Sequence, residues 1–90
     1  SPGASFFEKI NGQLFTVRTP DGLTLRGSVL RCRSQTPAGV VLFCHEFGGD
    51  RWSYQGHCPE RLLDTHDLVT FDFRHHGASD REQGYSPSHW

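Results

Sequence analysis

The residues best suited to chemistry follow a short apolar run at residues 40–43. Residues 45–49 read His-Glu-Phe-Gly-Gly, and a tight turn that contains glycine can aim backbone N–H groups into a cleft. Such groups stabilise the negative oxygen that develops in acyl transfer, by about 3–4 kcal/mol for each donor. Ligands of α/β folds bind just beyond the carboxyl ends of strands. The segment therefore predicts an acyl-transfer site, and a plain strand-to-helix turn is the alternative.

The side chains that would carry out the covalent step do not occur in a usable pattern. No Ser lies in a Gly-x-Ser-x-Gly turn after a strand, where a nucleophilic Ser is exposed. Cys44 ends the apolar run without an activating partner and is interpreted as a small buried residue. The six His residues show no spacing typical of a zinc site. We therefore expect no nucleophile, no triad, no metal and no cofactor in this chain.

Two alternating runs predict a hairpin before the candidate site. Residues 14–18 and 23–31 alternate apolar and polar side chains on either side of residues 19–22. That linker reads Thr-Pro-Asp-Gly, in which Pro presets φ, Asp bonds locally and Gly accepts a positive φ. The pattern indicates an antiparallel hairpin.

Two continuous runs predict a parallel pair of strands. Residues 40–43 are fully apolar and residues 68–73 nearly so, which is typical of strands covered on both faces. Between them, Pro59 interrupts the helical spacing, so we expect a loop to about His57 and a helix over residues 59–65. The fold class is therefore α/β, with one right-handed strand–helix–strand crossover.

Composition and charge exclude several classes of protein. The 90 residues carry a formal net charge of −1 without a basic stripe, so nucleic acid is not an expected partner. The longest uncharged apolar run, residues 40–44, is far shorter than the roughly 20 residues that span a membrane. The three Cys residues form no Cys-x-x-Cys pair and are expected to be free, buried thiols in a reducing compartment. We expect a cytoplasmic protein without a membrane partner.

Residues 45–49 and 72–79, the latter reading Asp-Phe-Arg-His-His-Gly-Ala-Ser, resemble two loops of the α/β-hydrolase family. The first is similar to the His-Gly-x-Gly oxyanion loop, in which the residue after His-Gly donates its backbone N–H. The resemblance implies that Phe47 is this donor. The positions that support the loop are His45, Glu46, Gly48 and Gly49. Glu46 stands where the family most often has Gly, and some relatives carry His-Glu there.

The second segment is similar to the family's Asp-x-Arg-Gly-x-Gly-x-Ser stretch. Four positions match, namely Asp72, Arg74, Gly77 and Ser79. The resemblance implies an architectural role, in which the Asp and the Arg brace the turn and the Ser caps the next segment of the chain. His75 replaces a Gly or Asn at a position expected to be left-handed, which His tolerates. His76 matches a common family His, implied to pack and to hydrogen-bond near the oxyanion loop.

The resemblance also implies an incomplete sheet. The strand order of the family is 1-2-4-3, and a further strand, not found in residues 1–90, would pair with residues 40–43. Without it, the most apolar strand would be an open edge. We therefore expect residues 1–12 to be a lead-in segment and residues 13–90 to be the N-terminal part of an α/β-hydrolase domain. The rest is expected as a second chain, a nicked product or a region outside this sequence.

The implied function is that of a serine hydrolase acting on an ester, thioester or amide of a small-molecule acyl substrate. This chain would supply the oxyanion loop, and the remainder would supply the nucleophile, the acid and the His. The chain alone is predicted to be inactive. An acyltransferase or a C–X- or C–C-cleaving enzyme of the same fold is a second hypothesis, and a non-catalytic interaction module is a third.

Overall fold

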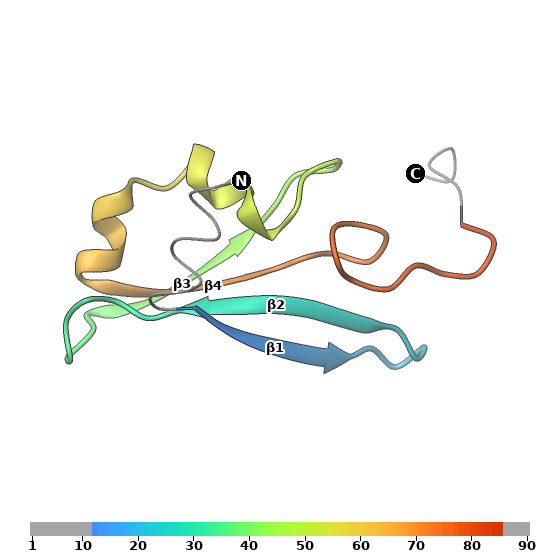
Figure 1. Ribbon diagram of the computed structural model, residues 1–90, viewed down its shortest axis with the longest axis horizontal. Helices are drawn as coiled ribbons and strands as arrows, with labels where there is room; N and C mark the ends of the chain where they lie inside the picture. Colours follow the sequence, from blue (N-terminus) through green and yellow to red (C-terminus); the bar gives the residue numbers. More distant parts are fainter. Residues whose placement is uncertain (1–11, 86–90) are drawn as a thin grey trace.

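The computed structural model describes residues 12–85, which form a four-stranded mixed sheet (Figure 1). Its strands are β1 (Gly12–Arg18), β2 (Thr24–Leu30), β3 (Gly39–Cys44) and β4 (His66–Phe71). They lie in the order β1-β2-β4-β3, with β3 and β4 parallel and the other neighbours antiparallel. The predicted α/β class and the predicted strand order are both confirmed.

The hairpin of β1 and β2 is the one that the alternating pattern predicted. The Gly22 N–H donates to the Thr19 carbonyl oxygen at 2.9 Å and closes the turn between the strands. β1 begins at Gly12, slightly before the alternating run. The expected lead-in segment 1–12 lies outside the described residues except for Gly12.

The connection between β3 and β4 differs from the single helix expected over residues 59–65. It contains two short 3₁₀ helices, η1 (Arg51–Gly56) and η2 (Glu60–Asp64). The predicted break at Pro59 is correct, because Pro59 lies at the N-cap of η2. β4 already begins at His66, so the second helix has room for little more than one turn. Connectors this short are frequently 3₁₀ rather than α-helical.

β4 lies earlier in the chain than the apolar run at residues 68–73 indicated. Its first residues, His66 and Asp67, are polar and therefore escaped the pattern. The buried Asp67 carboxylate accepts the Cys32 N–H at 2.8 Å, which lets a charged residue occupy the strand. Because β4 ends at Phe71, residue 72 and its successors form a loop beyond the carboxyl end of the strand.

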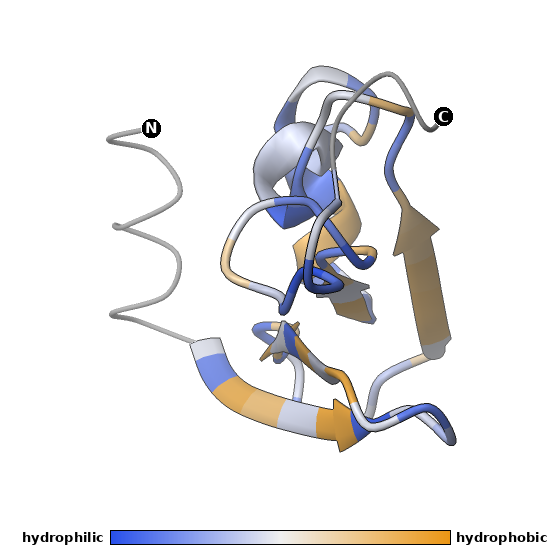
Figure 2. Ribbon diagram, turned by 90° about the vertical axis from the view of Figure 1, so that its right-hand side faces the viewer, coloured by the Kyte–Doolittle hydropathy of each residue, from blue (hydrophilic) through white to orange (hydrophobic). Residues whose placement is uncertain are grey.

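One face of the sheet carries the hydrophobic core. Its buried members are Leu30, Tyr54, Leu63 and Leu68, with Val41, Phe43, Trp52 and Cys58 packed against them. Figure 2 shows both 3₁₀ helices on this side of the sheet. The opposite face, here called the open face, has no described element packed on it. The open face contains a hollow of about 240 Å³, which is lined by Phe15, Val17, Leu25, Leu42, Val69 and Phe71.

β3 stands at the end of the strand order, so its second edge has no partner strand within residues 12–85. The side chains of β3 on the open face include Val40, which is 64% exposed, and Leu42, which is 60% exposed. An exposed apolar edge of this kind is a template for pairing with another strand. None of the helices formed by residues 12–85 has the length and apolar character that crossing a membrane requires.

Candidate active site

The loop after β3 forms a tight turn at the carboxyl end of the strand. The Gly49 N–H donates to the Glu46 carbonyl oxygen at 2.9 Å, which closes a β-turn with Phe47 and Gly48 at its centre. Gly48 has a φ of 83°, as the third residue of a type II turn requires. The Phe47 side chain is exposed, and the His76 ring meets it edge-on with centroids 5.6 Å apart. The expected oxyanion donor thus occupies the second position of this turn.

His45 and His76 join the loops after β3 and β4 reciprocally. His45 Nε2 accepts the Phe73 N–H at 3.0 Å, and His76 Nε2 accepts the Gly48 N–H at 3.0 Å. The two Nδ1 atoms lie 2.7 and 2.9 Å from backbone carbonyl oxygens of their own loops. A carbonyl oxygen only accepts, so each Nδ1 carries the proton and each imidazole is neutral in this arrangement. Both residues are buried, with ring centroids 4.9 Å apart.

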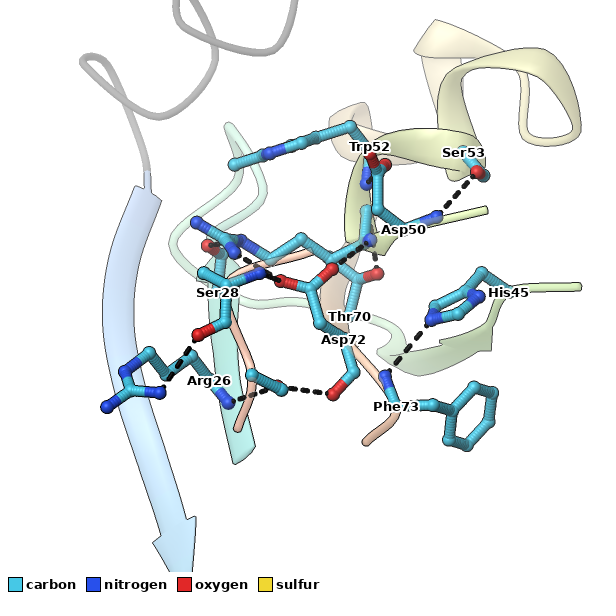
Figure 3. A network of polar contacts seen from close by, with 12 residues as sticks. Arg26, Ser28, His45, Asp50, Trp52, Ser53, Thr70, Asp72 and Phe73 are labelled. Carbon is cyan, nitrogen blue, oxygen red and sulfur yellow. Dashed lines mark hydrogen bonds and ion pairs between the residues drawn. The ribbon is translucent and has the colours of Figure 1, made fainter. Parts of the chain in front are cut away.

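Asp72 is the hub of a buried polar network directly after β4 (Figure 3). Its carboxylate accepts the Arg51 backbone N–H at 2.7 Å, Arg51 Nη1 at 2.6 Å and the Ala78 N–H at 3.0 Å. The Ser79 hydroxyl donates to the Asp72 carbonyl oxygen at 2.6 Å and accepts the Arg26 N–H at 2.8 Å. A buried charge is stable only when it is paired and hydrogen-bonded in this way. The network ties β2 and η1 to the loop after β4.

The same loop needs an unusual backbone. Gly77 has a φ of 50°, and a Cβ at this position would lie 2.4 Å from Asp72 Cγ. A side chain is therefore excluded here by contact as well as by conformation. His75 has a φ of 70°, as expected from the sequence, and its ring stacks on Tyr85 with centroids 3.6 Å apart.

Arg74 reaches from the loop after β4 to the β1–β2 turn. The resemblance implied that Arg74 braces its loop, as does Asp72, and among the described residues it bonds to Asp21 at 2.8 Å and to Glu82 at 3.0 Å. The Arg74 guanidinium, helped by the Thr19 hydroxyl, lowers the pKa of Asp21 from 3.8 to about 2. The same bond raises the pKa of Arg74. Arg74 therefore ties the loop after β4 to the β1–β2 turn.

Arg51 is the partner of Asp72, and the sequence pattern did not single it out. Its side chain is only 12% exposed, it donates Nε to the Ser28 hydroxyl at 3.1 Å, and its guanidinium lies 4.6 Å from the centre of the Trp52 ring. A buried carboxylate after an apolar strand does signal that a cation must lie nearby. Spacing alone does not say which of several Arg residues provides it.

The loops after β3 and β4, here called the loop cluster (residues 45–50 and 72–79), open onto one cleft of about 580 Å³. The cleft is lined by Phe47, Gly48, Gly49, Asp50, His75, His76, Gly77, Arg81 and Tyr85. The expected site residues outside this lining are His45, Glu46, Asp72, Arg74 and Ser79. The structure therefore brings both sequence motifs to one place, with the Phe47–Gly48 turn at the cleft and the Asp72 network behind it.

The described residues do not add a nucleophile or a metal site to this cleft. Cys44 is exposed, so its interpretation as a small buried residue was wrong. The reason is the alternation along β3, which leaves every second side chain exposed, Cys44 included. Cys32 is buried and Cys58 half-buried, and all three are free thiols. Within residues 12–85, no three His, Cys, Asp or Glu side chains gather as a metal ion would need.

No protein-family model matches the sequence, and no curated protein is similar to it at a significant level. Solved structures do match. A Burkholderia cenocepacia protein assigned as an aryl esterase is 25% identical with a TM-score of 0.55, over 78% of this chain and 25% of that one. The α/β hydrolase GrgF from Penicillium sp. sh18 is 23% identical with a TM-score of 0.61, over 81% and 25%. The bottromycin epimerase BotH, solved with bottromycin A2, is 27% identical with a TM-score of 0.58, over 78% and 26%.

The chain spans about a quarter of the length of these solved structures. Its hairpin, its parallel strand pair and its strand order are those of part of an α/β-hydrolase. The resemblance that the sequence motifs predicted is therefore confirmed at the level of the fold, and it indicates a hydrolase-like ancestry.

Proposed function

We propose that this chain supplies the oxyanion loop of an α/β-hydrolase-fold serine hydrolase that cleaves a small-molecule ester, thioester or amide. The backbone N–H of Phe47 is the proposed donor to the developing oxyanion. The nucleophile, the acid and the catalytic His belong to a part of the fold outside residues 1–90. Similarity to the aryl esterase supports an ester as the first substrate class to test.

One observation carries this proposal. The type II turn at Phe47 and Gly48 lies at the carboxyl end of β3, borders the cleft, and is held by a buried His from the neighbouring loop. Oxyanion donors work because they are oriented before the charge develops, so that little reorganisation is needed during reaction. A turn bonded to a second loop meets this requirement better than an unsupported surface turn.

The remaining fold is proposed to complete the sheet. A parallel strand is expected along the unpaired edge of β3, and further elements over the open face. Parallel strands of α/β proteins are normally covered on both faces, whereas Val40 and Leu42 are mostly exposed among the described residues. The completing part is a second chain, a nicked product or a continuation of this chain.

Substitution of Phe47 tests the proposal in the complete protein. Phe47→Pro removes the N–H and is expected to lower kcat about 100-fold or more with p-nitrophenyl esters, because one oxyanion donor is lost. Phe47→Leu keeps the N–H and is expected to retain much of the activity. Equal losses in both variants would contradict the backbone role. Purified residues 1–90 alone are expected to show no turnover above that of free imidazole.

BotH provides a specific reason to retain a second candidate. It is an epimerase that is similar to this chain, so the same scaffold occurs with chemistry other than ester hydrolysis. A C–X- or C–C-cleaving enzyme, an acyltransferase and a non-catalytic module remain alternatives. Labelling of the complete protein with a fluorophosphonate distinguishes them: a modified Ser supports the hydrolase or acyltransferase, and its absence supports the others.

A further inference from the structure

We propose that His76 is a positioning residue of the oxyanion loop, which acts through the Gly48 N–H. This inference rests on the proposed function, because it assigns a role to His76 in the site where Phe47 is the donor. His76 does not belong to the loop that it holds. It comes from the segment after β4, and its Nε2 lies 3.0 Å from the Gly48 nitrogen.

The hydrogen bond falls on the peptide group that decides the turn type. Type I and type II turns differ chiefly by rotation of the central peptide, which here joins Phe47 to Gly48. The N–H of this peptide is the group that His76 accepts. With that N–H directed at His76, Gly48 keeps its φ of 83° and the turn stays in the type II form. The Phe47 N–H belongs to the preceding peptide, whose Glu46 carbonyl oxygen accepts the Gly49 N–H and closes the same turn. A fixed turn therefore also limits rotation of the Phe47 N–H relative to the cleft.

His76 is itself fixed before it contacts the turn. Its Nδ1 donates to the Arg74 carbonyl oxygen at 2.9 Å, so Nε2 is left as the acceptor. The residue is 8% exposed and packs against the His45 ring. His45 holds the other end of the turn, because its Nδ1 donates at 2.7 Å to the Glu46 carbonyl oxygen that also accepts Gly49 N–H.

Two amide variants separate the acceptor from the rest of the side chain. The Gln amide extends about as far as Nε2, so His76→Gln retains an acceptor for Gly48, whereas the Asn amide reaches only the Nδ1 position. In the complete protein, with p-nitrophenyl acetate and butyrate, His76→Asn is expected to lower kcat about 10-fold, the scale of one lost hydrogen bond. KM is expected to change little, because the donor acts on the transition state. His76→Gln is expected to retain most of kcat.

A second measurement does not depend on turnover. In the ¹⁵N-labelled protein, His76→Asn is expected to accelerate amide hydrogen exchange at Gly48 about 10-fold or more, and His76→Gln to leave it near the wild-type rate. Unchanged Gly48 exchange in His76→Asn, or equal kcat losses in both variants, would overturn the positioning role. A protein in which exchange follows the expected order but no Ser is labelled and no ester is cleaved would refute the proposed function while confirming the hydrogen bond.

Discussion

The loop cluster and the open face belong to the same sheet but differ in the side chains that they present. The loop cluster contains buried polar groups, whereas the open face consists of apolar side chains. In the loop cluster, polar groups are paired within the chain: the buried Asp72 carboxylate has three donors, and the two buried histidines each accept a backbone N–H. On the open face, apolar side chains surround a hollow on which no element of residues 12–85 packs. The carboxylate and the two histidines of the first region are thus paired, whereas the second region presents apolar surface that a further element would bury.

This difference separates two steps in forming the proposed site. Two hydrogen bonds of the Phe47–Gly48 turn, from Gly49 N–H to the Glu46 carbonyl oxygen and from Gly48 N–H to His76, lie within the described residues. The cleft that the turn borders is lined by residues of both loops, and the proposed remainder of the fold would enclose it. We therefore expect substitutions in the loop cluster to act through lost polar pairing, and substitutions on the open face to report on the element that covers it.

The largest expected effect is at the hub of the loop cluster. Asp72→Ala leaves the mostly buried Arg51 guanidinium without its carboxylate, and breaking a buried ion pair costs about 3–5 kcal/mol. Urea unfolding of the complete protein measures this loss. Asp21→Ala is the matched control, since it removes a carboxylate that is half exposed. Similar losses in both variants would mean that the Asp72 network is no more important than a surface pair.

A smaller effect is expected at the open face. If the remainder of the fold covers it, Leu42→Lys in the complete protein should lower the free energy of unfolding by about 2–3 kcal/mol, the scale of a buried Leu side chain. Leu14→Lys is the control, because Leu14 is similarly exposed, at 64% against 60%, but is not part of the lining of the open face. If Leu42→Lys changes the free energy of unfolding by less than about 0.5 kcal/mol, the open face is not covered in the complete protein.

The smallest effect is expected at the exposed pair of Asp21 and Arg74. The pKa of Asp21 is about 2 in the folded chain against an ordinary 3.8, so its contribution to stability is present above pH 4 and is lost as the pH falls toward 2. Asp21→Asn should therefore flatten the pH dependence of unfolding between pH 4 and 2. In an NMR titration, Arg74→Gln should return the pKa of Asp21 toward 3.8. An unshifted pKa in the wild-type protein would contradict the pairing.

Local pattern was sufficient to predict the hairpin and the parallel strand pair, whereas the strand order came from the family resemblance. The hairpin around residues 19–22, the parallel pairing of the two apolar runs and the break at Pro59 all depend on short-range features: turn chemistry, alternation and the missing N–H of Pro. Local pattern erred over the helix at 59–65, because the length left between Pro59 and β4 accommodates only a 3₁₀ turn. The segments at 45–49 and 72–79 were connected in a different way, through their resemblance to two loops of the α/β-hydrolase family.

The choice of partners depended on the folded chain. Nothing in the spacing distinguishes Arg51 from Arg74 as the cation for Asp72, because the choice is decided by which guanidinium can reach a carboxylate buried behind η1. The crossed bonds of His45 and His76 likewise join segments from different strands, and they exist only because parallel strands end at the same edge of the sheet. Alternation along a strand specifies the face on which each side chain lies, whereas pairing between distant segments is set by the distances that packing creates.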